Sequence, residues 1–252
     1  MGAIDLHAHL GKWFFPIEAD GVDDLLRFME RNDIELSVVS SSRAVVYDFR
    51  EGNRELWEAI RGRRELLGYL FLNPNYLEES YEEMDRYLVR EEFVGLGELY
   101  DGGYIGGQRL DCDGHRRILE RMLERFPQRL VLFHCWGRDG VSRLLRLAKE
   151  FPEVKFVAGH MGHPDWELAA ESFRDVPNVY LEICSSSPIR GKLESVVRRI
   201  GADRVVFGSD STLINPAFVL GMVEESELGD EEKEMILRLN ARKLLGAGGG
   251  EV

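Results

Sequence analysis

The 252-residue chain lacks several features that mark other classes of protein. It has three cysteines, Cys112, Cys135 and Cys184, an odd number without paired spacing, so we expect free thiols and a reducing compartment. No apolar run approaches the roughly 18 residues that a membrane span needs. The first strand-like run begins at Gly2, which leaves no room for a signal peptide. These absences predict a cytoplasmic protein without a membrane partner.

Basic clusters are also scarce. The formal net charge is -13, and no block of Lys and Arg is longer than the stretch 61–64 (RGRR). A surface of this sign repels phosphate backbones, so nucleic acid is not an expected partner. The composition favours a small-molecule substrate instead.

Short apolar runs rich in β-branched residues alternate with longer amphipathic stretches along the whole chain. The strand candidates are 3–6, 36–39, 67–72, 93–96, 130–133, 154–158, 179–183 and 204–207. The helical patterns are 22–31, 54–63, 77–90, 115–126, 141–150, 165–173, 192–200 and 231–245. Such alternation predicts an α/β fold, a single-domain (β/α)8 TIM barrel over residues 1–252. We expect a frayed Gly-rich tail at 246–252 and the longest loops at 10–20, 40–52 and 99–114.

Four of the six histidines follow predicted strands, namely His7, His9, His134 and His160, and Asp210 follows the eighth. The carboxyl ends of barrel strands meet at one mouth, so these side chains should lie together. Taken alone, the triplet from His7 to His9 would more often be a solvent-facing or core pair. Its combination with three further strand ends predicts a His-rich site with one carboxylate, which suits a catalytic divalent metal.

The run from Asp5 to His9 (DLHAH) resembles the strand-one signature of the amidohydrolase superfamily, and His134, His160 and Asp210 resemble its strand-five, strand-six and strand-eight ligands. The segments 159–162 (GHMG), 208–210 (GSD) and 239–245 (LNARKLL) resemble the amidohydrolase-2 (amidohydrolase-related) branch. The likeness covers nearly the whole chain. This branch contains both hydrolases and nonoxidative decarboxylases.

The resemblance implies that His7, His9, His134 and Asp210 hold the metal, while His160 binds a second ion or hydrogen-bonds the attacking water. A divalent ion held by such ligands lowers the pKa of a bound water, and Asp210 could take the proton as a base. Zinc is the default ion for these donors, although manganese, iron and cobalt accept the same set, as one ion or two. The alternative for Asp210 is a cap on a helix that begins near residue 215.

Glu98 ends the fourth strand, where the resemblance places a bridging carboxylated lysine or a glutamate in members with two ions. The alternative is a structural Glu98 paired with Arg43. Of the remaining histidines, His163 is expected in a loop or cap, and His115 is expected on an exposed helix start.

Several side chains after the strands are candidates for contact with substrate. The set proposed as substrate-binding is Trp13, Arg43, Tyr100 and Arg190; Phe14, Tyr104, Ser185 and Ser186 also follow strands. An arginine beside the metal would suit a carboxylate-bearing substrate, whereas the aromatic residues suit a ring or an acyl chain.

The leading functional hypothesis is a metal-dependent hydrolase of a small-molecule amide, ester or lactone that uses a metal-activated water. One alternative is a metal-dependent nonoxidative decarboxylase, which would need Arg43 or Arg190 to seat a carboxylate. A metal-dependent deoxyribonuclease is suggested by the pair Gly97 and Glu98 but opposed by the acidic composition. A catalytically silent barrel with a binding role is the last alternative, and the sequence leaves a homodimer open.

Overall fold

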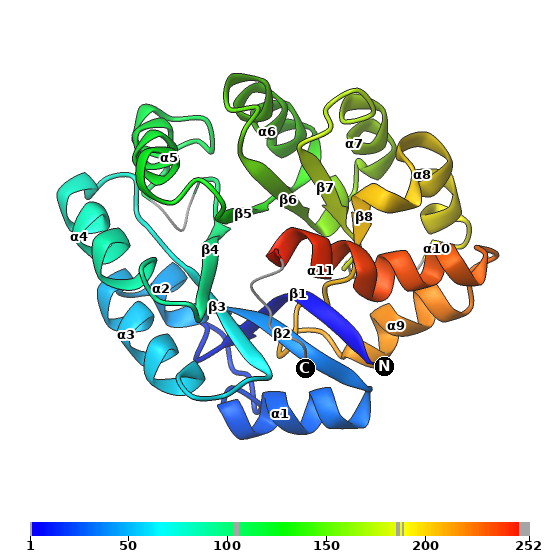
Figure 1. Ribbon diagram of the computed structural model, residues 1–252, viewed down its shortest axis with the longest axis horizontal. Helices are drawn as coiled ribbons and strands as arrows, with labels where there is room; N and C mark the ends of the chain where they lie inside the picture. Colours follow the sequence, from blue (N-terminus) through cyan, green and yellow to red (C-terminus); the bar gives the residue numbers. More distant parts are fainter. Residues whose placement is uncertain (1, 103–105, 185–186, 188, 247–252) are drawn as a thin grey trace.

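A computed structural model describes residues 2–102, 106–184, 187 and 189–246, and in it eight parallel strands follow one another around a barrel (Figure 1). The strands are β1 (Ala3–Leu10), β2 (Ile34–Ser41), β3 (Leu66–Leu70), β4 (Phe93–Leu99), β5 (Leu130–His134), β6 (Lys155–Gly159), β7 (Val179–Glu182) and β8 (Val205–Val206). The last strand returns to the first through hydrogen bonds from Leu6 N to Phe207 O (3.0 Å) and from Asp210 N to His7 O (2.7 Å). The predicted (β/α)8 barrel is therefore confirmed.

Helices surround the strands (Figure 1). They are α1 (Val22–Arg31), α2 (Ser42–Val46), α3 (Phe49–Ile60), α4 (Leu77–Tyr87), α5 (Asp113–Arg125), α6 (Gly137–Glu150), α7 (Trp166–Ser172), α8 (Lys192–Ile200), α9 (Pro216–Glu224), α10 (Asp230–Glu234) and α11 (Asn240–Leu245), with short 3₁₀ turns η2 (His160–Gly162) and η3 (Ala202–Arg204) and a π turn, η4 (Met235–Leu239). No helix within the described residues is both long and apolar enough to cross a membrane. The tail expected to fray falls, from residue 247 on, outside the described residues.

The long loop predicted over 40–52 is wrong, because α2 and the start of α3 occupy it. Ser41 caps α2 by accepting a hydrogen bond from Ala44 N (3.1 Å), and the Asp48 carboxylate caps α3 by accepting from Arg50 N and Glu51 N. Helix α3 thus begins at Phe49, five residues before the predicted start at residue 54. The helix α9 was also missed, and the predicted helix 231–245 is interrupted by η4.

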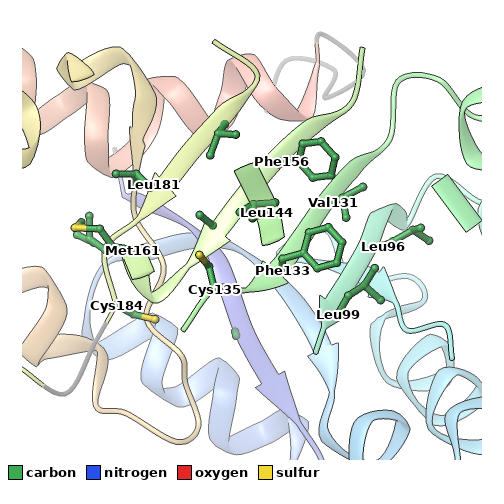
Figure 2. Close-up of a cluster of buried hydrophobic side chains, with 14 of the residues drawn as sticks. Leu96, Leu99, Val131, Phe133, Cys135, Leu144, Phe156, Met161, Leu181 and Cys184 are labelled. Carbon is green, nitrogen blue, oxygen red and sulfur yellow. The ribbon is translucent and has the colours of Figure 1, made fainter. Parts of the chain in front are cut away.

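Successive residues of a strand point alternately into two apolar layers, one inside the barrel and one between the strands and the helices. In β5, Leu130 and Leu132 belong to the inner cluster that fills the barrel, whereas Val131 and Phe133 belong to the outer cluster beneath the helices. Phe133 stacks on Phe156 of β6 with ring centroids 5.8 Å apart (Figure 2). Helix α11 adds Ala241 and Leu244 to the inner cluster. The barrel interior is therefore filled by apolar side chains up to the layer where the polar strand ends begin.

The eighth strand is the shortest, and side chains and backbone of the C-terminal helices hold it. Asn240 is buried and donates hydrogen bonds to Ala202 O (2.7 Å) and Val205 O (2.8 Å). Phe207 N donates to Ile236 O at 3.0 Å. The segment that leads to Asp210 is thus positioned from outside the sheet.

Candidate metal centre

Six side chains from five strands meet at the carboxyl end of the barrel. These are the residues predicted as metal ligands: His7 and His9 within β1, Glu98 in β4, His134 at the end of β5, His160 after β6 and Asp210 after β8. All are buried except His134, whose side chain is 25% exposed. The parallel barrel brings these residues together because every strand points the same end toward this mouth.

Glu98 lies between two groups of histidines and directs one carboxylate oxygen toward each. Its Oε2 is 3.3 Å from both His7 Nε2 and His9 Nε2, and these atoms define the first half-site. Its Oε1 is 2.8 Å from His134 Nδ1 and 3.5 Å from His160 Nε2, which define the second half-site. In each group, all the donor atoms lie within 4.8 Å of one another. The alternative that Glu98 pairs with Arg43 is wrong.

Asp210 joins the first half-site, with its Oδ1 3.3 Å from His9 Nε2 and 3.9 Å from His7 Nε2. The alternative that Asp210 caps the following helix is also wrong. The side chain of Asn215 caps α9 instead, because it accepts a hydrogen bond from Ala217 N at 3.0 Å. Asp210 is therefore free of a structural role at a helix end and faces the histidines.

The residues present fit a divalent metal ion. His7 Nε2 and His9 Nε2 are 3.2 Å apart, and both face carboxylate oxygens of Glu98 and Asp210. Neutral imidazoles and carboxylates that converge their lone pairs in this way are ligands of zinc and similar ions. His9 Nδ1 is buried and has no hydrogen-bond partner among the described residues. Among these residues, the polar contacts of the His9 ring are therefore all made by Nε2, the nitrogen that faces Glu98 and Asp210.

Electrostatics in the cluster keep the carboxylates ionised. Burial raises the pKa of Glu98, but the charges of His7 and His134 and the hydrogen bonds to His134 and His160 together outweigh burial and hold that pKa well below its usual value. Burial, the largest single cause, likewise raises the pKa of Asp210, but the hydrogen bond to His9 and the charges of the neighbouring histidines together lower it by more. The pKa of His9 is raised in return, against burial, by hydrogen bonds to Asp210 and Glu98. Both carboxylates are therefore available as ligands near neutral pH.

The backbone at two of these residues adopts the left-handed conformation, which residues other than glycine seldom use. His160 has φ of 61° and Asp210 has φ of 56°. Such conformations cost on the order of 1 kcal/mol each and persist where the surrounding structure holds them. At Asp210 this support includes the hydrogen bond from its backbone N–H to His7 O. Of the six donors, these two are the ones that follow a strand, whereas the other four lie within one.

Two buried residues beside the cluster were missed from the sequence. Glu182 Oε2 accepts a hydrogen bond from His7 Nδ1 (2.9 Å), and Cys184 Sγ lies 3.2 Å from His160 Nδ1. Burial raises the pKa of Glu182, but the hydrogen bond and charge of His7, together with His160 and Cys184, outweigh burial and lower it. Burial raises the pKa of the Cys184 thiol well above its usual value. A carboxylate inside the apolar run 179–183 was the available signal for Glu182.

Of the residues proposed to bind substrate, two lie beside the cluster. Trp13 packs edge-on against His9 with ring centroids 5.3 Å apart, and Tyr100 stacks on His134 at 4.5 Å. Trp136, which was not predicted from the sequence, also stacks on His134 at 5.7 Å and is 45% exposed. These rings form an aromatic surface around the histidines.

The two arginines proposed to bind substrate pair with other residues. Arg43 contacts Glu55 at 2.8 Å. Arg190 lies 3.7 Å from Glu227, and its side chain is 96% exposed. Of the other candidates, Phe14 is exposed and stands next to Trp13, while Tyr104, Ser185 and Ser186 lie outside the described residues.

The prediction that His115 is an exposed surface histidine is wrong. Its side chain is buried, its Nδ1 donates a hydrogen bond to Leu110 O (2.9 Å), and its ring packs edge-on against Phe133. Burial lowers the pKa of His115 to about 4. His163 lies in a loop after η2, as predicted, where its carbonyl accepts a hydrogen bond from Gly137 N.

The amidohydrolase family model (Amidohydro_2) matches residues 4–247 of the chain. No protein among curated sequences matches it. A proposed amidohydrolase from Staphylococcus aureus is 19% identical, with a TM-score of 0.76 over 98% of this chain and 100% of that one. Two further solved structures, both less than 20% identical, are named as a decarboxylase and as a hydrolase.

The first is a dihydroxybenzoic acid decarboxylase from Polaromonas with bound manganese and 2-nitroresorcinol; it is 18% identical, with a TM-score of 0.75 over 97% of this chain and 96% of that one. The second is a proposed 2-pyrone-4,6-dicarboxylic acid hydrolase from Acinetobacter baumannii with citric acid bound. It is 15% identical, with a TM-score of 0.69 over 98% of this chain and 100% of that one. At these identities the likeness shows the shared barrel fold alone.

Proposed function

The chain belongs to the amidohydrolase family, and we propose that it is a metal-dependent hydrolase that cleaves a C–N or C–O bond in a small-molecule amide, ester or lactone. The observation that supports this proposal most is the position of Glu98. One carboxylate oxygen faces the first half-site and the other faces the second, which suits a ligand shared by two divalent ions. Zinc fits the donors, and manganese is bound by the Polaromonas decarboxylase.

Each donor has a role in this proposal. His7, His9 and Asp210 would hold one ion with Glu98, and His134 and His160 would hold the other with the same carboxylate. A divalent ion supplies Lewis acidity, since it polarises a carbonyl and lowers the pKa of a coordinated water.

Asp210 is the proposed catalytic base. Its carboxylate is ionised, lies at the mouth of the barrel and is slightly exposed, at 7%. It would take a proton from the attacking water and deliver it to the nitrogen or oxygen that leaves. Trp13, Tyr100 and Trp136 would contact the substrate and exclude water from this side of the cluster.

Nonoxidative decarboxylation is the second candidate, because one structurally similar protein is a dihydroxybenzoic acid decarboxylase. That reaction needs a cation to seat the substrate carboxylate beside the metal. Arg43 and Arg190 pair with glutamates elsewhere, and no arginine within the described residues forms an ion pair with the six donors. We therefore keep hydrolysis as the leading proposal and decarboxylation as its alternative, and the net charge of -13 argues against a deoxyribonuclease. The three cysteines are free, which suits the cytoplasmic location that we propose.

Metal content per chain tests the shared-ligand arrangement. The protein is purified without a chelator or a His tag, and its metal is counted by mass spectrometry for the parent chain, Glu98→Gln and a control, Glu83→Gln. Glu83 is an equally buried glutamate on α4 that pairs with Arg86 and Arg50. We expect two ions in the parent and the control, and one or none in Glu98→Gln. If the parent binds a single ion and Glu98→Gln still binds it, Glu98 is not a ligand shared by two ions.

Activity tests the reaction class on the same samples. Amides, esters and lactones are screened for hydrolysis, and hydroxybenzoic acids are screened for release of carbon dioxide. We expect hydrolysis that falls at least about 100-fold in Asp210→Asn, because the amide cannot accept the proton from water. Release of carbon dioxide without hydrolysis would make the protein a lyase.

A further inference from the structure

Behind the cluster, one buried carboxylate contacts elements of both half-sites. Glu182 ends β7 and is fully buried. Its Oε2 lies 2.9 Å from His7 Nδ1, 3.0 Å from His160 N and 3.0 Å from Cys184 Sγ. None of these contacts uses the ring nitrogens that face Glu98. The carboxylate therefore acts on the histidines from the side opposite the donor cluster.

The direction of each proton follows from what these groups can donate. An ionised carboxylate only accepts hydrogen bonds, so His7 Nδ1 carries the proton toward Glu182. His7 Nε2 then presents its lone pair to the first half-site, where Glu98 Oε2 lies 3.3 Å away. The hydrogen bond to Glu182 thus selects one of the two tautomers of His7.

Cys184 extends the same selection to the second half-site. Its thiol donates to Glu182 Oε2, which leaves the sulfur lone pairs available to accept from His160 Nδ1 at 3.2 Å. His160 Nε2 then faces His134 Nδ1 at 3.1 Å and Glu98 Oε1 at 3.5 Å. A single chain of hydrogen bonds thus runs from Glu182 through Cys184 to His160.

Gly208, which follows β8, leaves room for this carboxylate. A Cβ atom on Gly208 would lie 2.6 Å from Glu182 Oε1 and 2.7 Å from its Cγ, so a side chain at this position would displace Glu182. The absence of a side chain at Gly208 is therefore a packing requirement of the buried glutamate. It gives the motif 208–210, which contains Asp210, a role in placing a residue at the end of the neighbouring strand β7.

We propose that Glu182 is a positioning residue that, directly for His7 and through Cys184 for His160, sets which ring nitrogen each histidine presents to the metal ions. This inference rests on the proposed function, because it requires ions in the two half-sites. Removal of a hydrogen-bond partner behind a ligating histidine typically weakens metal affinity by about 10–100-fold.

Zinc affinity tests the inference, measured by competition with a chromophoric chelator on the parent chain, Glu182→Gln, Cys184→Ala, Cys184→Ser and the control Glu83→Gln. We expect Glu182→Gln to weaken binding of both ions by about 10–100-fold, because its amide can donate to His7 Nδ1 and so permits the wrong tautomer. Cys184→Ala should weaken one ion of the two. Cys184→Ser should restore much of that affinity, since a hydroxyl also donates and accepts.

A spectroscopic measurement separates positioning from a general structural effect. Long-range ¹H–¹⁵N spectra of the zinc-loaded protein show which ring nitrogen carries the proton, and the chain has six histidines to assign. We expect His7 and His160 of the parent to carry the proton on Nδ1, and the His7 signal to change in Glu182→Gln but not in Glu83→Gln.

Two results would overturn the inference, and only the second of them would also overturn the proposed function. If the parent binds two zinc ions and Glu182→Gln keeps the same affinity and the same His7 spectrum, Glu182 does not position the ligands, while the proposed function stands. If the parent binds no zinc, manganese or cobalt, both the proposed function and this inference fail.

Discussion

The Tyr100 hydroxyl donates a hydrogen bond of 2.7 Å to Glu98 Oε2, the oxygen that also faces His7 and His9. Tyr100 is buried, and its ring stacks on His134. The Tyr100 hydroxyl therefore orients the Glu98 carboxylate, while the Tyr100 ring packs against His134 of the second half-site.

Replacement of Tyr100 by Phe tests this contact because it removes the hydroxyl and keeps the ring. We expect the affinity for metal to fall by about tenfold, and the free energy of unfolding to fall by about 1–2 kcal/mol, since a hydrogen bond to a buried charged group is lost. Chelator competition and urea unfolding measure the two effects. Tyr47→Phe is the control, because the exposed Tyr47 bonds the Trp13 carbonyl instead. Equal affinities for both variants would contradict the role of Tyr100.

Gly208→Ala should disturb the metal centre without touching a donor. The added Cβ would lie 2.6 Å from Glu182 Oε1 and would push this carboxylate away from His7. We expect zinc affinity to fall by about tenfold or more. Gly221→Ala is the matched control in α9, where a Cβ meets open space. It should leave zinc binding unchanged and raise the free energy of unfolding by about 0.5–1 kcal/mol, because alanine favours a helix over glycine.

Removal of metal should destabilise the fold. An ion that binds the folded state alone adds about 2.7 kcal/mol to the free energy of unfolding when its free concentration is 100 times its dissociation constant. For a chain of this size we expect chelation to lower the melting temperature by about 5–10 °C, measured by thermal unfolding with and without a chelator. Glu98→Gln should show a smaller shift, since it holds fewer ions. An equal melting temperature with and without chelator would indicate that the donors are empty in the purified protein.

The buried His115 predicts a loss of stability in mild acid. Burial lowers its folded-state pKa from 6.5 to about 4, so between these values the unfolded chain binds a proton that the folded chain does not. Stability from this group is complete above pH 6.5 and decreases as the pH falls to about 4, by up to about 3 kcal/mol. Urea unfolding of the parent and His115→Gln at pH 7 and pH 4.5 checks this, because other groups cancel in the comparison. The same pH dependence in both proteins would disprove it.

The sequence allowed prediction of the barrel and of the convergence of six polar side chains, because both follow from the repeated strand and helix pattern. In a parallel barrel, a residue at the end of one strand lies near residues at the ends of the others whatever their separation along the chain. This explains why His7 and Asp210 could be placed together before the structure was known.

Features that depend on helix boundaries could not be predicted in this way. The short helix α2 replaces an expected loop and carries Arg43 toward Glu55 instead of Glu98. His115 has the charged neighbours Arg116 and Arg117, which suggested exposure, but α5 begins at Asp113 and turns the imidazole toward Phe133. At about 3.6 residues per turn, an error of one or two residues in a helix start changes the expected direction of a side chain by about 100° or more. Ser41 and Asp48 were available signals for the starts of α2 and α3, whereas Cys112 before α5 makes no side-chain cap.

The clamp formed by the two hydrogen bonds from Asn240 to the backbone at and just before β8 has a consequence for the order of assembly during synthesis. Its carbonyl partners, Ala202 and Val205, precede Asp210, while the clamp itself comes thirty residues after that aspartate. A ribosome that has released only residues up to Asp210 therefore exposes every proposed donor but lacks the side chain that locks the last strand. The metal centre can reach its final form only once translation has passed Asn240.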